Sequence, residues 1–194
     1  MLKNSTTSPL RRTLTSSYHP IPMNWREKGV GISRILFGLV WVIAALLKWQ
    51  PQFQNTFVDQ ASAAQDGQPA PIHAWISFWA HLISTNPLLF ARIEATTESA
   101  IALFLILGLF SNLTAIVGIF LSLGIWSVAE GFGGPYIPGQ STDIGTAFPY
   151  ALLFVLLLFL SAGRYYGLDA WLTPRLGKLG FLAAGSVRRS RKQV

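Results

Sequence analysis

The stretch ARIEATTESAIALFLILGLF, residues 91–110, places charged side chains directly before a long apolar run. Its charged residues are Arg92, Glu94 and Glu98. A charged side chain at the centre of a bilayer costs roughly 2.5–3.5 kcal/mol, so such groups normally face the interior of a helix bundle. Because Glu94 and Glu98 are separated by one helical turn, they share one face of a helix. The stretch predicts a membrane-spanning helix with a buried acidic face.

The composition of the whole chain agrees with a membrane protein. Of 194 residues, 51% are hydrophobic and only 12% are charged, whereas soluble domains are about 25% charged. Several apolar runs approach the roughly 20 residues that cross the hydrocarbon core, where only helices satisfy their own backbone. They lie at 30–49, 87–110, 113–129 and 144–163. We therefore expect an all-α integral membrane bundle of four transmembrane helices.

The distribution of basic residues predicts the orientation of this bundle. The formal net charge is +7, and the outer loops 50–86 and 130–143 contain neither Lys nor Arg. Lys and Arg accumulate in cytoplasmic segments of membrane proteins. We therefore expect a multi-pass protein of the cell (plasma) membrane with both termini in the cytoplasm. In this interpretation the basic residues determine the orientation of the protein in the membrane, and nucleic acid is not an expected partner.

The chain divides into a membrane domain and two basic cytoplasmic tails. Residues 1–28, rich in Ser, Thr and Pro, are expected to be disordered. Residues 29–172 form the membrane domain, and 173–194 form the second tail, which either lies on the anionic inner leaflet or is merely solvated. Within the first outer loop, apolar residues recur at helical spacing over 72–84 and predict an amphipathic helix at the outer interface.

The first span offers possible counter-charges for the acidic face. One stripe of this helix combines basic residues at its two ends with small residues that permit close helix packing. Lys48 is expected to reach toward Glu94, and Arg34 toward Asp169 beyond the last span. The alternative is that both basic side chains extend to the two membrane interfaces. The stripe consists of Arg34, Gly38, Trp41, Ala45 and Lys48.

The loop EGFGGPYIPGQSTDIG, residues 130–145, is the other unusual feature. Its Gly and Pro residues predict turns that could fold over the mouth of a bundle and bring Tyr136 and Asp143 to a ligand. Alternatively it is a rigid connector in which Asp143 caps the last span. The chain has no cysteine, and His73 and His81 are too far apart in the sequence for the short spacing of a metal-ligand pair. We therefore expect no metal or haem site.

These motifs together resemble the DoxX/DoxD family of small four-helix membrane proteins. The resemblance covers about residues 29–172, and the loop GGPYIPGQSTDIG is similar to the DoxD branch. That branch is named for the small membrane subunit of thiosulfate:quinone oxidoreductase, which couples two thiosulfates to tetrathionate and passes electrons to quinone. The motifs are Arg34, Gly38, Lys48, Glu98, Leu107-Gly108 and AGRYYGLD at 162–169.

The resemblance implies a membrane subunit of a quinone-linked oxidoreductase. Glu98 and Glu94 are then the expected catalytic, proton-carrying residues, since quinone reduction takes up two protons with two electrons. With no cofactor bound covalently, the chain needs a second oxidoreductase subunit, expected on the outer face, with quinone as electron acceptor. The expected ligand-binding residues for quinone or substrate are Lys48, Arg34, Arg92, Tyr136 and Asp143.

Two other functions stay open at the level of sequence. In a non-catalytic membrane protein that anchors or organises a partner complex, the same carboxylates would lock helix packing. A small-solute or ion pathway is the least favoured function, because four short spans leave little room for a pore. A homo-oligomer in the lipid bilayer is compatible with each of these functions.

Overall fold

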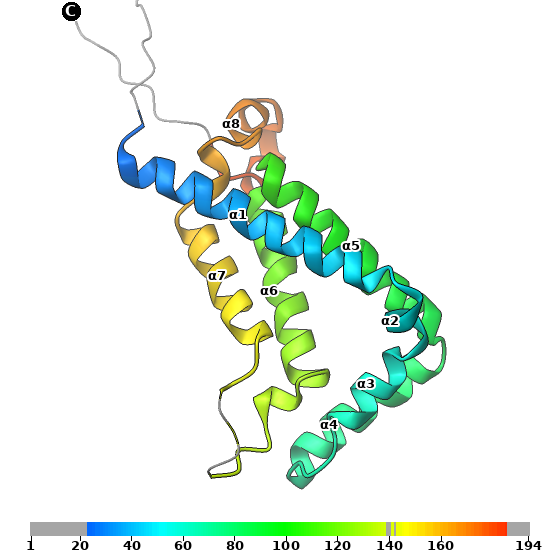
Figure 1. Ribbon diagram of the computed structural model, residues 1–194. Coiled ribbons are helices and arrows are strands. Elements are labelled where there is room, and N and C mark those ends of the chain that lie inside the picture. The colour runs from blue at the N-terminus through cyan, green and yellow to red at the C-terminus, as the bar shows by residue number, and fades with distance from the viewer. Residues whose placement is uncertain (1–22, 139–140, 142, 186–194) are drawn as a thin grey trace, which may run out of the picture. The chain divides into compact units, whose positions relative to one another are not determined.

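The described part of the chain consists of helices joined by turns (Figure 1). The computed structural model describes residues 23–138, 141 and 143–185, and no strand occurs among them. The expected all-α class is therefore confirmed. The elements described below belong to one compact unit, Asn24–Val187. The expectations for tail residues 1–22 and 186–194 lie outside the described residues.

Four helices, here called the long helices, correspond to the four apolar runs. They are α1 (Trp25–Lys48), α5 (Pro87–Leu107), α6 (Ser111–Val128) and α7 (Ala147–Phe159). Of these, α1 and α6 are long and apolar enough to cross a membrane, which supports a membrane location. Helix α5 carries the charges of 91–98, and the 13 residues of α7 extend only about 20 Å at 1.5 Å per residue.

Helix α1 begins earlier than its apolar run. The Asn24 side chain accepts a hydrogen bond from the Glu27 backbone N–H at 2.9 Å, and the Glu27 carboxylate accepts one from the Asn24 N–H at 2.8 Å. This reciprocal capping box starts the helix at Trp25. Residues 25–28, which were expected to belong to the disordered tail, are therefore helical, because the cap outweighs their polarity.

The long helices pack as two pairs, α1 with α5 and α6 with α7 (Figure 1). Aromatic rings join the pairs: Phe154 of α7 is fully buried, and its ring centroid lies 4.9 Å from that of Phe37 and 5.4 Å from that of Trp41. Gly118 of α6 leaves the space that the Phe154 ring fills. The centre of the bundle is thus a packed aromatic core.

Helices from the segment between α1 and α5, together with a turn after α6, form the end of the bundle where α1 finishes. They are α2 (Pro51–Asn55), α3 (Phe57–Ala63), α4 (Ala70–Ser84) and the 3-10 turn η1 (Gly131–Gly133). Helix α4 confirms the helix expected over 72–84, whereas α2 and α3 were not expected. Helices α3 and α4 pack through a small apolar cluster, Ala61, Ala80 and Ile83.

At the opposite end of the bundle, Arg34 ties α1 to α5 and to the segment after α7. Its buried guanidinium donates to the carbonyl oxygens of Leu105 and Ile106 in the last turn of α5. It also donates to the carbonyls of Tyr165 and Tyr166, at 3.2 and 3.1 Å. A helix C-terminus leaves carbonyls without partners and favours positive charge. The Arg34 guanidinium supplies both the hydrogen-bond donors and the positive charge.

Asp169 makes a matching contact at the start of α6. Its Oδ2 accepts hydrogen bonds from the backbone N–H groups of Ser111 and Ala184, both at 2.9 Å. The side chain is fully buried at the first residue of α8 (Asp169–Leu172). Among the described residues no ion pair joins Arg34 to Asp169, so the expected pair is wrong. Each side chain instead satisfies a helix end, where orphan backbone groups are more numerous.

The remaining segments complete this end of the bundle. The 3-10 turn η2 (Ala162–Arg164) follows α7, and the chain continues after α8 through η3 (Thr173–Arg175) and η4 (Gly177–Leu182). The described part of the second tail, which was expected from residue 173, therefore contains local helical turns.

Large apolar side chains lie on the outside of all four long helices, while several charged and hydroxyl groups are buried inside. Arg34, Glu98 and Asp169 are each at most 2% exposed. An exposed apolar surface of this extent is unusual for a soluble monomer. Exposed examples are Ile32, Leu36, Ile43 and Leu46 on α1, Leu103 on α5, Phe120 on α6, and Leu152, Leu156 and Phe159 on α7.

We predict that Arg34 is required for stability. The substitution Arg34→Met leaves buried carbonyl oxygens without hydrogen-bond donors, and each unpaired carbonyl costs about 1–3 kcal/mol of stability. Thermal unfolding in mild detergent, followed by size-exclusion chromatography, should show a clear loss of stability. The matched control Arg92→Met removes an exposed arginine and should change stability by no more than about 0.5 kcal/mol. Equal thermal stability of the two variants would contradict the assigned role.

Candidate functional site

An ion-pair cluster lies where the end of α1 meets the middle of α5. The Lys48 Nζ is 2.5 Å from the Glu94 Oε1 and 3.8 Å from the Glu98 Oε1. The Glu98 side chain is only 2% exposed, whereas those of Glu94 and Lys48 are 15% and 21% exposed. The pair expected between Lys48 and Glu94 is thus present, and the lysine also faces the deeper carboxylate.

Small residues on α1 and α5 bring these charges together. A Cβ added at Gly38 would come within 2.8 Å of the Ile106 side chain, so only glycine permits this approach. Ala45 on α1 and Ala91 and Ala95 on α5 are buried along the same contact. Small residues let helix backbones approach closely. Because the two helices run antiparallel, close packing near Gly38 places Lys48 beside the acidic turns of α5.

Hydroxyl groups line the neighbouring turns of α5. The Trp49 Nε1–H donates to the Ser99 Oγ at 3.0 Å, and that hydroxyl donates to the Ala95 carbonyl at 2.8 Å. The Thr97 hydroxyl donates to the Ile93 carbonyl at 2.7 Å. These hydroxyls are therefore engaged with helix backbone, and the charged cluster is formed by Lys48 and the two glutamates.

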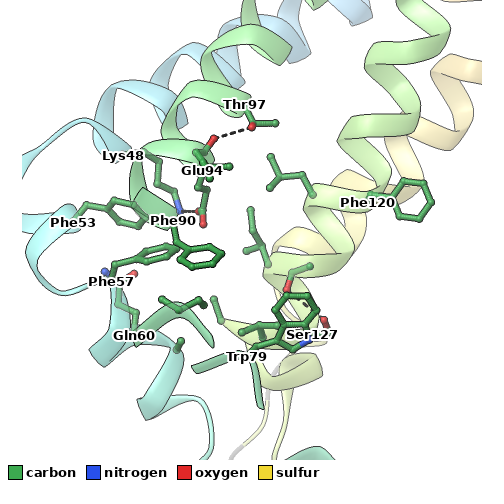
Figure 2. Close-up of a pocket in the computed structure, with 18 of the residues that line it drawn as sticks. Lys48, Phe53, Phe57, Gln60, Trp79, Phe90, Glu94, Thr97, Phe120 and Ser127 are labelled. Atoms are coloured by element: carbon green, nitrogen blue, oxygen red, sulfur yellow. Dashed lines mark hydrogen bonds and ion pairs between the residues drawn. The ribbon is translucent and has the colours of Figure 1, made fainter. Parts of the chain in front are cut away.

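One wall of a large apolar cavity carries Lys48 and Glu94. This cavity, here called the aromatic cavity, has a volume of about 280 Å³ and lies between α5 and α6, bounded by α2, α3 and α4. Figure 2 shows Lys48 beside Glu94 at one side, with the Phe53 ring next to the tip of Lys48 and the rings of Phe57 and Phe90 below them. Other lining residues are Gln60, Trp75, Trp79, Ile83, Leu121, Ile125 and Ser127.

The ammonium group of Lys48 also faces an aromatic ring of this cavity. Its Nζ lies 4.2 Å from the centroid of the Phe53 ring. A cation over an aromatic face is attracted by the ring quadrupole, and more strongly where water is excluded. Phe53 therefore helps to hold the lysine at the cavity wall, within reach of both a ligand and Glu94.

A second cavity lies on the other side of the charged cluster. This polar cavity has a volume of about 220 Å³ and is enclosed by α1, α5, α6 and α7. Lys48 and Ile125 line both cavities. Its surface is mainly apolar, but it is richer in polar atoms than that of the aromatic cavity. The residues that carry polar or ionisable groups are Trp41, Lys48, Glu98, Ser122, Glu130, Thr146 and Tyr150.

Three buried polar atoms at the polar cavity have no hydrogen-bond partner among the described residues. They are the Trp41 Nε1, the Glu98 Oε2 and the Ser122 Oγ. Each of these side chains is at most 2% exposed. Buried polar groups in proteins normally have a partner, from the protein or from ordered water. The residues that line this cavity therefore carry one donor, one acceptor and one hydroxyl whose hydrogen-bonding capacity is unused among the described residues.

Glu130 fixes the end of this cavity at the junction of α6 and α7. Its Oε1 accepts from the Thr146 hydroxyl at 2.5 Å, and its Oε2 accepts from the Ala147 N–H at 3.0 Å. A carboxylate is favourable at a helix N-terminus. Glu130 thus caps α7, and the alternative that Asp143 caps this helix is wrong, because Asp143 accepts from the Gly145 N–H instead.

The structure brings together only part of the predicted site. Lys48, Glu94 and Glu98 meet as expected. Arg34 lies 14 residues earlier on α1, about 21 Å away at 1.5 Å per residue, with its guanidinium bound to carbonyls. Arg92 is exposed on α5 and takes part in neither ion pair of the described residues.

The two loop residues of the predicted site lie on the surface. Tyr136 is exposed and donates from its hydroxyl to the Phe132 carbonyl at 2.6 Å, and Asp143 is also exposed. Neither lines the aromatic cavity or the polar cavity. In the described structure, the loop therefore contributes to the site through Glu130, at its beginning, and not through the residues expected.

Sequence reasoning gave no site role to Trp41, Ser122 or Glu130. Trp41 was recognised only as part of the packing stripe of the first span. Ser122 is an isolated hydroxyl within an apolar run, a pattern that can mark an interior position. Glu130 is a carboxylate directly after that run and before a glycine-rich loop. A search for polar residues facing the same depth as Glu98 would have found the first two.

We predict a measurable energetic coupling between Lys48 and Glu94. The single variant Lys48→Met leaves two carboxylates without their cation, whereas adding Glu94→Gln removes part of that penalty. A double-mutant cycle on thermal stability in detergent should give a coupling of about 1–3 kcal/mol. The same cycle with Lys28, an exposed lysine at the start of α1, should give no coupling to Glu94. Additive effects of Lys48→Met and Glu94→Gln would refute the interaction.

Comparisons of this chain with protein-family models, with curated proteins and with solved structures find no match.

Proposed function

We propose that the chain is a four-span protein of the cell membrane with both termini in the cytoplasm. The apolar outer faces of α1, α5, α6 and α7 support this topology, because lipid is the environment in which such faces are stable. The absence of Lys and Arg from loops 50–86 and 130–143 supports the orientation. The cluster of Lys48, Glu94 and Glu98 then lies in the outer half of the bilayer.

Within this topology we propose a membrane subunit of a quinone-linked oxidoreductase, with quinone bound in the aromatic cavity. The observation that carries the proposal is the placement of Lys48 and Glu94 on the wall of a cavity otherwise lined mainly by aromatic and aliphatic side chains. Ligand cavities commonly measure about 300–1,000 Å³ and combine apolar walls with a few polar groups. At about 280 Å³, this cavity suits a single ring system.

Each side chain of the cluster has a role in this proposal. Phe57 and Phe90 provide apolar surface for a ring, and the Lys48 ammonium donates a hydrogen bond toward a carbonyl oxygen at the wall. Glu94 accepts a hydrogen bond from Lys48 and keeps it in place. Glu98, deeper and almost fully buried, holds and passes a proton. Proton transfer by a positioned carboxyl group typically contributes about 10²–10⁴-fold to a rate.

The balance of the reaction requires a partner. A quinone takes up two electrons and two protons to become a quinol, and the oxidation of two thiosulfates to one tetrathionate releases two electrons. We propose thiosulfate:quinone oxidoreductase of the DoxX/DoxD type as the specific form of this activity. The electrons come from a second oxidoreductase subunit at the outer face, while this chain supplies the quinone site and the protons.

A non-catalytic anchoring protein is the second candidate. The observation that favours it is the bonding of the Arg34 terminal nitrogens and of the Asp169 Oδ2 to backbone groups at helix ends, which gives both residues structural roles. On this alternative the pair of Lys48 with Glu94 is a further packing lock. A solute pathway is least favoured, because Phe37, Trp41 and Phe154 fill the centre of the bundle.

We predict that Glu98→Gln abolishes thiosulfate-dependent quinone reduction while the protein accumulates normally. The amide keeps the shape of the side chain but cannot carry the proton, so the rate should fall by about 10²–10⁴-fold. The assay uses the chain purified in mild detergent with its co-purifying proteins, and decylubiquinone as acceptor. Asp59→Asn, an exposed acid on α3, serves as the control and should keep the wild-type rate.

The possible outcomes of this experiment distinguish the candidate functions. A wild-type complex that reduces no quinone with thiosulfate rules out the specific activity, and an unchanged rate in Glu98→Gln rules out the assigned proton role. Loss of accumulation in Glu98→Gln supports the packing lock. Quinone binding is measured independently by quenching of tryptophan fluorescence, which should diminish in Trp79→Phe at the cavity and not in Trp171→Phe at the opposite end.

A further inference from the structure

The charged cluster separates two cavities of different chemistry. The aromatic cavity has mainly apolar walls, whereas the polar cavity contains Glu98, Ser122, Glu130 and Tyr150. Among the described residues, Lys48 is the only charged side chain that lines both cavities. A group that faces an apolar ligand space on one side and a polar space on the other is suited to passing protons between them.

The unpartnered atoms at the polar cavity indicate its occupant. A buried polar atom without a partner costs about 1–3 kcal/mol, and here the Trp41 Nε1, the Glu98 Oε2 and the Ser122 Oγ are in that position at one cavity. A water molecule needs only about 10–15 Å³ of volume accessible to its centre. A cavity of about 220 Å³ therefore has room for several water molecules beside the residues that carry these three atoms.

We propose that the polar cavity holds water and is the inlet through which protons reach Glu98 from the outer end of the bundle. Glu130 and Thr146 line it where α6 ends and α7 begins, and Trp41, Glu98 and Ser122 line its deeper part. The ionisable groups that face it are Lys48, Glu98, Glu130 and Tyr150. Hydration of the cavity stands on this geometry alone, while delivery of the protons to quinone rests on the proposed function.

The donor and acceptor pattern selects water over other small occupants. The Trp41 Nε1–H only donates hydrogen bonds, and the Lys48 ammonium is positively charged, so both disfavour a bound metal or alkali cation. The carboxylates of Glu98 and Glu130 disfavour an anion. Water both donates and accepts hydrogen bonds, and so suits a cavity wall that carries an indole, a hydroxyl and a carboxylate. Each proton that Glu98 gives up is then replaced by one that moves along the water chain. The protonation state of Glu98 is therefore the same before and after each transfer.

Single-cysteine labelling tests the inlet directly, since the natural chain contains no cysteine. Ser122→Cys on α6 and Ala44→Cys on α1 place a thiol at the polar cavity. Ile43→Cys is the matched control, because Ile43 is adjacent to Ala44 but faces outward, with 61% of its surface exposed. The probe is methanethiosulfonate ethylammonium, added to the protein reconstituted in lipid vesicles.

The reactive species is the thiolate, which forms only in contact with water. Both cavity thiols should therefore react at least about tenfold faster than the Ile43→Cys thiol, which faces lipid. All three variants should label fully after denaturation in detergent, which verifies that each thiol is intact. If either cavity position reacts no faster than the lipid-facing control, the cavity is dry and the inlet is wrong.

A second measurement tests separately whether protons pass from the polar cavity to quinone. Labelled Ser122→Cys fills the cavity and should reduce quinone at least about tenfold more slowly than the same variant before labelling, in keeping with loss of a positioned proton donor. Labelled Ile43→Cys should show no such change. Fast labelling without any effect on quinone reduction overturns the delivery step. If the unlabelled wild type reduces no quinone, the proposed function fails, and the labelling rates alone decide whether the inlet exists.

Discussion

The close antiparallel contact of α1 with α5 is the constraint on which the rest of the structure depends. Gly38 allows the two backbones to approach, and the buried alanines Ala45, Ala91 and Ala95 continue the contact toward the end of α1. This spacing lets Lys48 span from one helix to the carboxylates of the other. A larger residue at Gly38 would separate the helices and, with them, the charges on which both cavities rely.

The two ends of the bundle differ in how their polar groups are used. Around Arg34 and Asp169, charged side chains are bound to backbone groups of α5, α6 and the segment after α7, so this end is closed. Around Lys48, the charged groups are bound to one another and border two cavities. The fold therefore uses charged groups to bind helix ends at one end of the bundle and to border two cavities at the other.

Sequence reasoning predicted the helices and the charged cluster because both follow from local patterns. Apolar runs of membrane length and the spacing of Glu94 and Glu98 needed no knowledge of tertiary structure. The failures concern interactions between backbone and side chain across the fold. Opposite charges suggested that Arg34 would meet Asp169, but orphan carbonyl and N–H groups at helix ends leave no trace in the sequence. The role of Glu130 was missed for the same reason.

The base of the loop between α6 and α7 has a consequence for how this protein can vary. Trp126 donates to the Ile144 carbonyl at 2.7 Å, and Glu130 binds the first turn of α7. The two helices are thus joined across the base of the loop, independently of the residues farther out. Lengthening a loop closed in this way costs only about 0.6 kcal/mol for each doubling. Insertions there can accordingly create new binding specificities at the bundle mouth while the helices keep their positions.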